Sequence, residues 1–86
     1  MTSLHRVTRR ALTRRLRRDP HGLRMWHALD DDLGLLPLEL VLVVLDIETE
    51  ARVKVPVDEL ASVKTLGDLY RYVTKAAVDQ RLAACA

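Results

Sequence analysis

The sequence predicts one small all-α domain, an arrangement of four helices with a long first loop and a short third helix. Separate segments of the chain repeat their apolar residues at helical spacing, and Pro, Gly and charged residues divide them. The composition also fits a folded domain, because 49% of the 86 residues are hydrophobic and 30% are charged. A chain of this length has room for one core only, so we expect a single domain over residues 1–86.

The first predicted helix runs from Thr2 to about Arg17 and has two unlike sides. Its apolar side holds Leu4, Val7, Ala11, Leu12 and Leu16. Its basic side holds Arg6, Arg9, Arg10, Arg14 and Arg17. The helix then ends between Asp19 and Gly22, because Pro20 lacks a backbone donor. We expect residues 19–36 to form a long ordered loop, held by Leu23, Met25, Trp26, Leu29 and Leu33.

The apolar run from Leu38 to Ile47 allows two interpretations. Its short length and its three valines favour a buried strand. A complete helical face, however, is formed at spacings of i, i+3, i+4, i+7 and i+11 by Leu40, Val43, Val44, Ile47 and Ala51. Pro37 also suits the first turn of a helix. We therefore predict a helix from about Pro37 to Ala51.

The last part of the chain is predicted to contain a single helical turn from Val57 to Ala61 and then a final helix. Thr65 and Asp68 resemble a capping box in which Asp replaces the usual Glu. Apolar residues at helical spacing carry the final helix to about Arg81, and we expect residues 82–86 to fray.

The sequence contains no catalytic or metal-binding constellation, so we expect no enzyme, no metal site and no cofactor. Cys85 is the single cysteine, which excludes an internal disulfide. The three histidines lack the spacing of metal ligands, and the run from Asp30 to Asp32 lacks the alternating ligands and the Gly turn of a calcium loop. No apolar run approaches the roughly 20 residues of a membrane span.

Charge is distributed unevenly along the chain. Residues 1–27 contain eight Arg and one Asp, whereas residues 28–50 contain seven acidic residues and no basic one. The Arg-rich first helix could bind the phosphate groups of nucleic acid or another anionic surface. The alternative, which we favour, is a solvated face that the domain's own acidic residues partly neutralise. One Trp and two Tyr are also too few for a platform that stacks single-stranded nucleic acid.

The order of the elements and the spacing of several short motifs resemble the acyl carrier protein family. The family pattern reads approximately D-L-G-x-D-S-L-x-x-V-E-L-V, followed by I-P and then by T-V-x-D. The spacings fit without a gap, and the matching residues are Asp32-Leu33-Gly34, Leu38, Val41, Val43-Val44, Val55-Pro56, Thr65-Leu66 and Asp68. The resemblance covers nearly the whole chain. It implies an acyl-carrier-protein-like bundle of four helices and favours a helix over a strand for residues 38–47.

The main departure from that family lies at the start of the second helix. In acyl carrier proteins, the Ser of the D-S-L triplet carries phosphopantetheine through its hydroxyl, but the triplet here is Leu36-Pro37-Leu38. The side chain of proline has no nucleophilic atom, so the resemblance implies a degenerate member that cannot form this phosphodiester. A second departure lies on the outer face of the same helix, where Leu42 stands at a position that is usually acidic in the family. At the position of Ala51 the family often has Phe, and we expect Trp26 to cover the core there.

The outer face of the second helix is the surface that the resemblance assigns to partner enzymes. In this chain Leu38, Val41, Leu42 and Leu45 form an apolar stripe, which Glu39 and Asp46 edge. A small domain rarely leaves such a stripe exposed to water. Either a binding partner covers it, or the first helix or the long loop of the same chain does. We therefore predict a cytoplasmic interaction module in a fatty-acid, polyketide or related biosynthetic cluster, which binds a protein partner or a second copy. Binding of nucleic acid or an anionic surface by the Arg-rich helix is the alternative.

Overall fold

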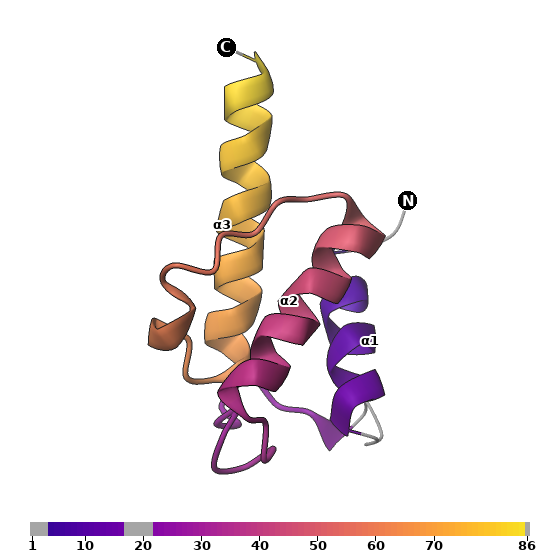
Figure 1. Cartoon of the computed structure of the whole chain (residues 1–86), viewed down its shortest axis with the longest axis vertical. Helices are drawn as coiled ribbons and strands as arrows, with labels where there is room; N and C mark the ends of the chain where they lie inside the picture. Colours follow the sequence, from indigo (N-terminus) through magenta and orange to yellow (C-terminus); the bar gives the residue numbers. More distant parts are fainter. Residues whose placement is uncertain (1–3, 17–21, 86) are drawn as a thin grey trace.

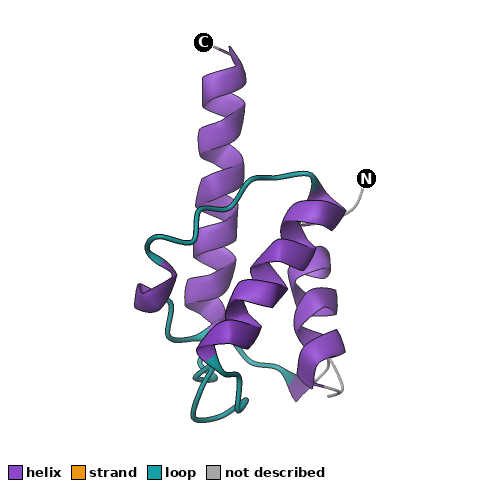
Figure 2. Ribbon diagram, in the orientation of Figure 1, coloured by secondary structure: helices purple, strands orange, loops and turns teal. Residues whose placement is uncertain are grey.

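The computed structural model describes residues 4–16 and 22–85 (Figure 1). These residues form three α-helices, α1 (Leu4–Leu16), α2 (Pro37–Ala51) and α3 (Leu66–Cys85), and a 3₁₀ turn, η2 (Leu60–Ser62). No strand occurs in these ranges, where Ala28 and Thr65 form an isolated β-bridge (Figure 2). The all-α prediction is therefore confirmed, and the run from Leu38 to Ile47 is helical. The bundle of four helices is not confirmed, because three α-helices are present in the described chain.

In place of the helical turn predicted from Val57 to Ala61, the structure has the 3₁₀ turn η2 (Leu60–Ser62). The backbone of Val63 returns to an extended conformation directly after this turn, with φ −82° and ψ 110°. One turn fixes several dihedral angles for few hydrogen bonds, so it does not continue without strong helical propensity. Leu60 holds the turn in place because its side chain is buried in the core.

The core lies where the predicted apolar faces of the helices meet. Figure 1 shows α1 and α2 side by side, with the longer α3 extending beyond them. The helices contribute to the core the buried side chains Val7, Ala11, Leu12, Leu40, Val43, Val44, Ile47, Leu66, Leu69, Tyr70 and Val73. The predicted apolar faces of α1 and α2 are thus confirmed, although Leu4, Leu16 and Ala51 pack at the edge of the core and are half-buried.

The predicted capping box begins α3. Thr65 Oγ1 accepts a hydrogen bond from the backbone N–H of Asp68 at 3.1 Å, and Asp68 Oδ2 accepts one from the backbone N–H of Thr65 at 3.2 Å. These two bonds satisfy backbone donors that a helix start otherwise leaves without partners. At its other end α3 continues to Cys85, so the prediction that it ends near Arg81 and then frays is wrong for residues 82–85.

The loop before α2 is ordered by its leucines, but Trp26 does not cover the core. Leu23, Leu29 and Leu33 are buried as predicted, whereas Trp26 is 69% exposed and Met25 is 49% exposed. The reason lies in the backbone, because Met25 O accepts a hydrogen bond from the N–H of Gly67 at 2.9 Å. This contact holds residues 25 and 26 outside the start of α3. A Cβ at Gly67 would lie 3.2 Å from that carbonyl oxygen, so a small residue suits the position.

Candidate functional site

The position that the family resemblance matches to the attachment point of acyl carrier proteins lies at the first turn of α2. Pro37 is the first helical residue, and Leu36 before it has the extended backbone of an N-cap, with φ −75° and ψ 154°. Glu39 Oε1 accepts a hydrogen bond from the backbone N–H of Leu36 at 3.1 Å. Leucine has no acceptor with which to return a bond, so one half of a capping box is present. Neither Leu36 nor Pro37 offers an oxygen or sulfur nucleophile at this helix start.

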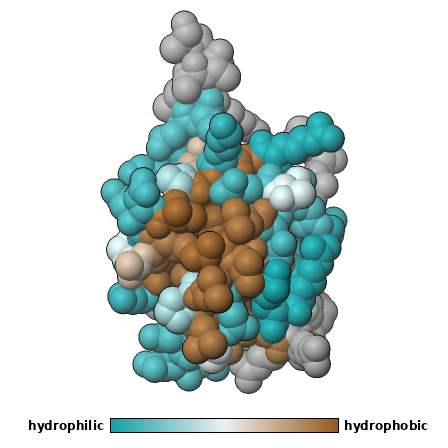
Figure 3. All heavy atoms as spheres, in the orientation of Figure 1, coloured by the Kyte–Doolittle hydropathy of each residue, from teal (hydrophilic) through white to brown (hydrophobic). Residues whose placement is uncertain are grey.

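The predicted apolar stripe on α2 is exposed at its ends and half-covered in its middle. Leu38 is 70% exposed and Leu45 is 46% exposed, whereas Val41 and Leu42 are half-buried. Val41 is covered because it packs against the core cluster. Neither α1 nor the long loop covers the two ends of the stripe. Figure 3 shows apolar side chains gathered on the face where α2 and the connection to α3 lie.

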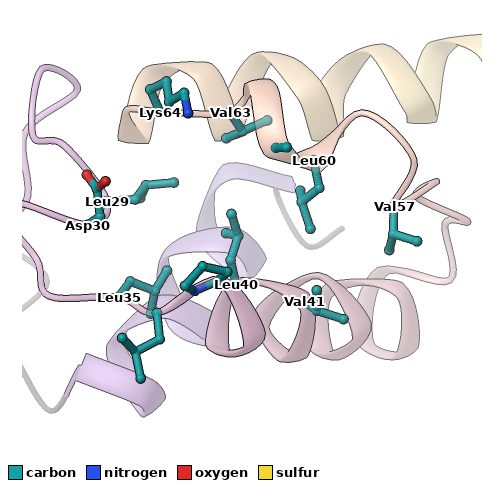
Figure 4. Close-up of a pocket in the computed structure, with 12 residues that line it drawn as sticks. Leu29, Asp30, Leu35, Leu40, Val41, Val57, Leu60, Val63 and Lys64 are labelled. Atoms are coloured by element: carbon teal, nitrogen blue, oxygen red, sulfur yellow. The ribbon is translucent and has the colours of Figure 1, made fainter.

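A pocket of about 300 Å³ opens beside this stripe, between the first turns of α2 and residues 57–64 (Figure 4). Its lining is apolar apart from Asp30 and Lys64, and it also includes Leu29, Leu35, Leu36, Pro37, Leu40, Val41, Val57, Leu60, Ala61 and Val63. The sequence analysis missed this pocket. Val57, Leu60 and Val63 are apolar residues close together in the sequence, but only Leu60 belongs to η2, so no helical spacing announced this wall.

The acidic residues that edge the stripe are used within the chain. Glu39 binds the N–H of Leu36, and Asp46 Oδ2 lies 3.4 Å from Arg15 Nη2. Further along α2, Glu50 Oε1 lies 3.1 Å from Arg10 Nη1 and 3.2 Å from Arg14 Nη2. Asp46 and Glu50, in the C-terminal half of α2, are therefore paired with arginines of α1.

The same ion pairs divide the predicted basic surface of α1. Arg10 and Arg14 contact Glu50, while Arg6 and Arg9 are exposed and form no ion pair with any described residue. Arg17 lies outside the described residues. Arg15, which the sequence analysis did not place on this surface, is a further partner of α2. These contacts agree with the interpretation that α1 presents a partly neutralised face.

Neither a membrane span nor a metal-ligand cluster occurs among the residues that the structure describes. None of its helices is both long and apolar enough to cross a membrane. Within the same residues, no group of three or more His, Cys, Asp or Glu side chains is placed to hold a metal ion.

The comparison with known proteins relates this chain to carrier proteins. No protein-family model matches it. Over 47 residues, however, the chain is 45% identical to the acyl carrier protein of Thermotoga maritima, a stretch that covers 55% of this chain and 58% of that relative. The chain thus matches less than two thirds of the relative's length. The match supports the predicted relationship to the acyl carrier protein family. The loss of the attachment serine remains a prediction from the sequence.

Proposed function

We propose that this chain is an acyl-carrier-like protein that carries no phosphopantetheine and acts as a non-catalytic interaction module. It acts in the cytoplasm as part of a fatty-acid, polyketide or related biosynthetic assembly. It binds its partner through the outer face of α2. In this proposal η2 is the remnant of the short third helix of a four-helix carrier. The observation that carries the proposal is Pro37 at the first position of α2, where the family resemblance places the modified serine.

Two features of the same helix support a binding role without a cofactor. Leu36 and Leu38, on either side of Pro37, are 63% and 70% exposed, so an apolar surface stands where the prosthetic group would emerge. Exposed apolar side chains grouped on one face are typical of surfaces that contact other proteins. The helix start is also intact, because Glu39 binds the N–H of Leu36.

The first experiment tests the absence of modification. The protein is incubated with coenzyme A and a phosphopantetheinyl transferase of broad specificity, and its intact mass is measured. We expect no added mass, because Pro37 has no hydroxyl to attack the phosphate. A serine-containing acyl carrier protein in the same tube serves as the positive control. A single stoichiometric adduct on this chain would contradict the proposal.

The second experiment tests the binding surface with Leu38→Glu and Leu45→Glu. Both leucines are exposed, at 70% and 46%, so the monomer should retain its helicity and melting behaviour. Burying the exposed part of each leucine at an interface stabilises a complex by about 0.7–2 kcal/mol, so each change should weaken binding roughly 3-fold to 30-fold. Thr74→Glu, at an exposed position of α3, is the control with the same charge change.

The measurement is sedimentation velocity of the protein alone and with a purified carrier-dependent synthase. Loss of a complex in the two α2 variants and its retention in Thr74→Glu would support the proposal. Equal binding by all three variants would show that the stripe is not the interface.

Binding of nucleic acid by α1 is the alternative function. Arg6 and Arg9 are the exposed guanidinium groups that favour it, whereas Arg10 and Arg14 are already paired with Glu50. A salt titration of binding to duplex DNA separates the two functions, because contacts with phosphate weaken steeply as salt rises.

A further inference from the structure

A second pocket lies between residues 56–59 and the outer side of α3, and its volume is about 270 Å³. Tyr72 and Asp79 line it from α3. Tyr70 stacks instead on His5 of α1, with the ring centroids 4.6 Å apart. Tyr72 lies two positions after Tyr70, so the two side chains leave α3 on nearly opposite sides. The pocket therefore faces away from α1, and Figure 1 shows η2 and α1 at opposite sides of the molecule.

Hydrogen bonds between distant segments hold the shape of this pocket. The Tyr72 hydroxyl donates to the carbonyl oxygen of Pro56, and the backbone N–H of Lys54 donates to Gln80 Oε1 at 3.1 Å. These bonds tie the connection after α2 to α3. Pro56, Tyr72 and Ala76 supply the apolar part of the lining. The volume equals that of about nine water molecules at ~30 Å³ each, so one arginine side chain fits inside it.

The remaining lining of the pocket is mainly acidic. Asp58, Glu59 and Asp79 contribute carboxylates, and Lys75 contributes the one ammonium group among the lining residues. None of these four side chains forms an ion pair with a residue that the structure describes. Burial, together with the charges of Glu59 and Asp58, raises the pKa of the Tyr72 hydroxyl above its ordinary value of 10.0. The carboxylates thus act on the space beside the Tyr72 ring, which favours a cation there.

The cations that complement this pocket are exposed on α1. Arg6 and Arg9 form no ion pair with any described residue, whereas Arg10, Arg14 and Arg15 are paired with α2. Residues three apart are neighbours on the surface of a helix, so Arg6 and Arg9 form one basic patch. A guanidinium group pairs with carboxylates and stacks on an aromatic face, and the pocket offers both. Because the pocket faces away from α1, these arginines can fill it only in another copy of the chain.

We propose that Arg6 and Arg9 of one copy bind the acidic pocket of a second copy. One guanidinium group enters the pocket beside Tyr72, and the other pairs with a carboxylate at its rim. The two surfaces differ and every copy has both, so the contact is head-to-tail and generates chains or rings rather than a two-fold dimer. This inference goes beyond the proposed function and does not rest on it, because Leu38 and Leu45 belong to neither surface.

The experiment separates the two surfaces in two double variants. Arg6→Gln with Arg9→Gln keeps only the pocket, and Asp58→Asn with Glu59→Gln keeps only the basic patch. Sedimentation velocity at low salt should show the wild type growing beyond a dimer as its concentration rises. Each double variant alone should stay monomeric, whereas their equimolar mixture should form a dimer that grows no further.

Matched variants test whether the charge matters at the pocket itself. Asp31→Asn with Glu48→Gln makes the same charge change outside the pocket, so it should associate as the wild type does. Lys75→Met removes the competing cation and should strengthen association up to about fivefold, the range of one exposed ion pair. Lys64→Met, outside the pocket, is its control and should leave association unchanged. Raising the salt concentration should dissociate the wild type.

The results can overturn this proposal separately from the interaction function. A wild type that stays monomeric, or a mixture of the two double variants that stays monomeric while both keep their helicity, would refute it. Unchanged or weaker association of Lys75→Met would also refute it. Self-association that Leu38→Glu abolishes and Arg6→Gln with Arg9→Gln leaves intact would assign the contact to the stripe on α2. That last result would overturn this proposal and support the proposed function.

Discussion

The start of α2 allows a direct test of how this helix is held in place. Leu36 occupies the N-cap position and makes no side-chain hydrogen bond to the helix. Pro37 has no N–H, so the backbone donors left without an intrahelical partner are those of Leu38 and Glu39. Leu36→Ser introduces an acceptor for them and completes the capping box, because Glu39 already binds the N–H of residue 36 at 3.1 Å.

The expected size of the effect comes from two opposing contributions. A serine at an N-cap stabilises a helix by about 1 kcal/mol relative to alanine, within a range of about 0.5–2 kcal/mol. Leu36 is 63% exposed, so the covered part of its side chain contributes about 0.5–1 kcal/mol, which both substitutions lose. Leu36→Ser should therefore match the wild type approximately and exceed Leu36→Ala by about 1 kcal/mol. For a domain of this size, that difference corresponds to about 4–8 °C in Tm.

Leu36→Asp adds a charge to the same acceptor. Its interaction with the positive end of the helix contributes about 0.3–1 kcal/mol more, and repulsion from Glu39 and Asp30 removes part of this gain. We expect a net stabilisation of about 0.5 kcal/mol over the wild type.

Urea unfolding followed by far-UV circular dichroism measures these differences. The midpoints should rank Leu36→Asp highest and Leu36→Ala lowest, at an unchanged slope. Equal midpoints for Leu36→Ser and Leu36→Ala would refute the capping argument. A large loss in all three variants would show instead that Leu36 is buried in a core or an interface.

Two further predictions concern the cap of α3 and the turn before α2. The hydrogen bond from Arg71, and then those from the backbone N–H groups of Lys64 and Thr65, hold the pKa of Asp68 below its ordinary value of 3.8. The stability that Asp68 contributes is thus complete above that unfolded-state pKa and is lost as the pH falls through the lower folded-state pKa, so Asp68→Asn should flatten the acid limb of a plot of urea midpoint against pH. Gly34 has φ +66°, so Gly34→Ala should lower the free energy of unfolding by about 1–2 kcal/mol, whereas Gly22→Ala, in open space, should leave it nearly unchanged.

The features that could be predicted from the sequence are those set by neighbours along the chain. Helical spacing placed Val43, Val44 and Ile47 in the core, where each is fully buried. The pair of Thr65 and Asp68 fixed the start of α3, because both bonds of a capping box join residues three positions apart. Pro37 marked the start of α2 for the same local reason.

The features that were missed depend on contacts between distant segments. Trp26 was expected to cover the core at Ala51, where the family often has Phe, but the bond between the N–H of Gly67 and the carbonyl of Met25 holds its loop outside. The spacing of apolar residues in the sequence does not predict that hydrogen bond, because it joins two distant segments. The pocket likewise forms where residues 57–64 lie close to α2. The distance between these two segments is set by the tertiary structure, so the local sequence pattern does not predict it.

The ion pairs between α1 and α2 determine which kind of contact can bind a partner to this protein. Arg10, Arg14 and Arg15 contact the carboxylates of Asp46 and Glu50, so the C-terminal half of α2 presents little net charge to a partner. Attraction between exposed charges is weakened further by salt. Binding at the stripe must then come mainly from apolar contact.

That apolar contact is limited, because Val41 and Leu42 are already half-buried and have less surface to remove from water. Leu38 and Leu45 are 70% and 46% exposed, so their burial supplies a gross of about 2–3.5 kcal/mol, which is below the lower estimates for the entropy lost on association. A partner that used the stripe alone would therefore form a short-lived complex. A long-lived complex requires additional contacts, and the exposed side chains of Leu36 and Val57, at 63% and 47%, are the adjacent apolar surface that can provide them.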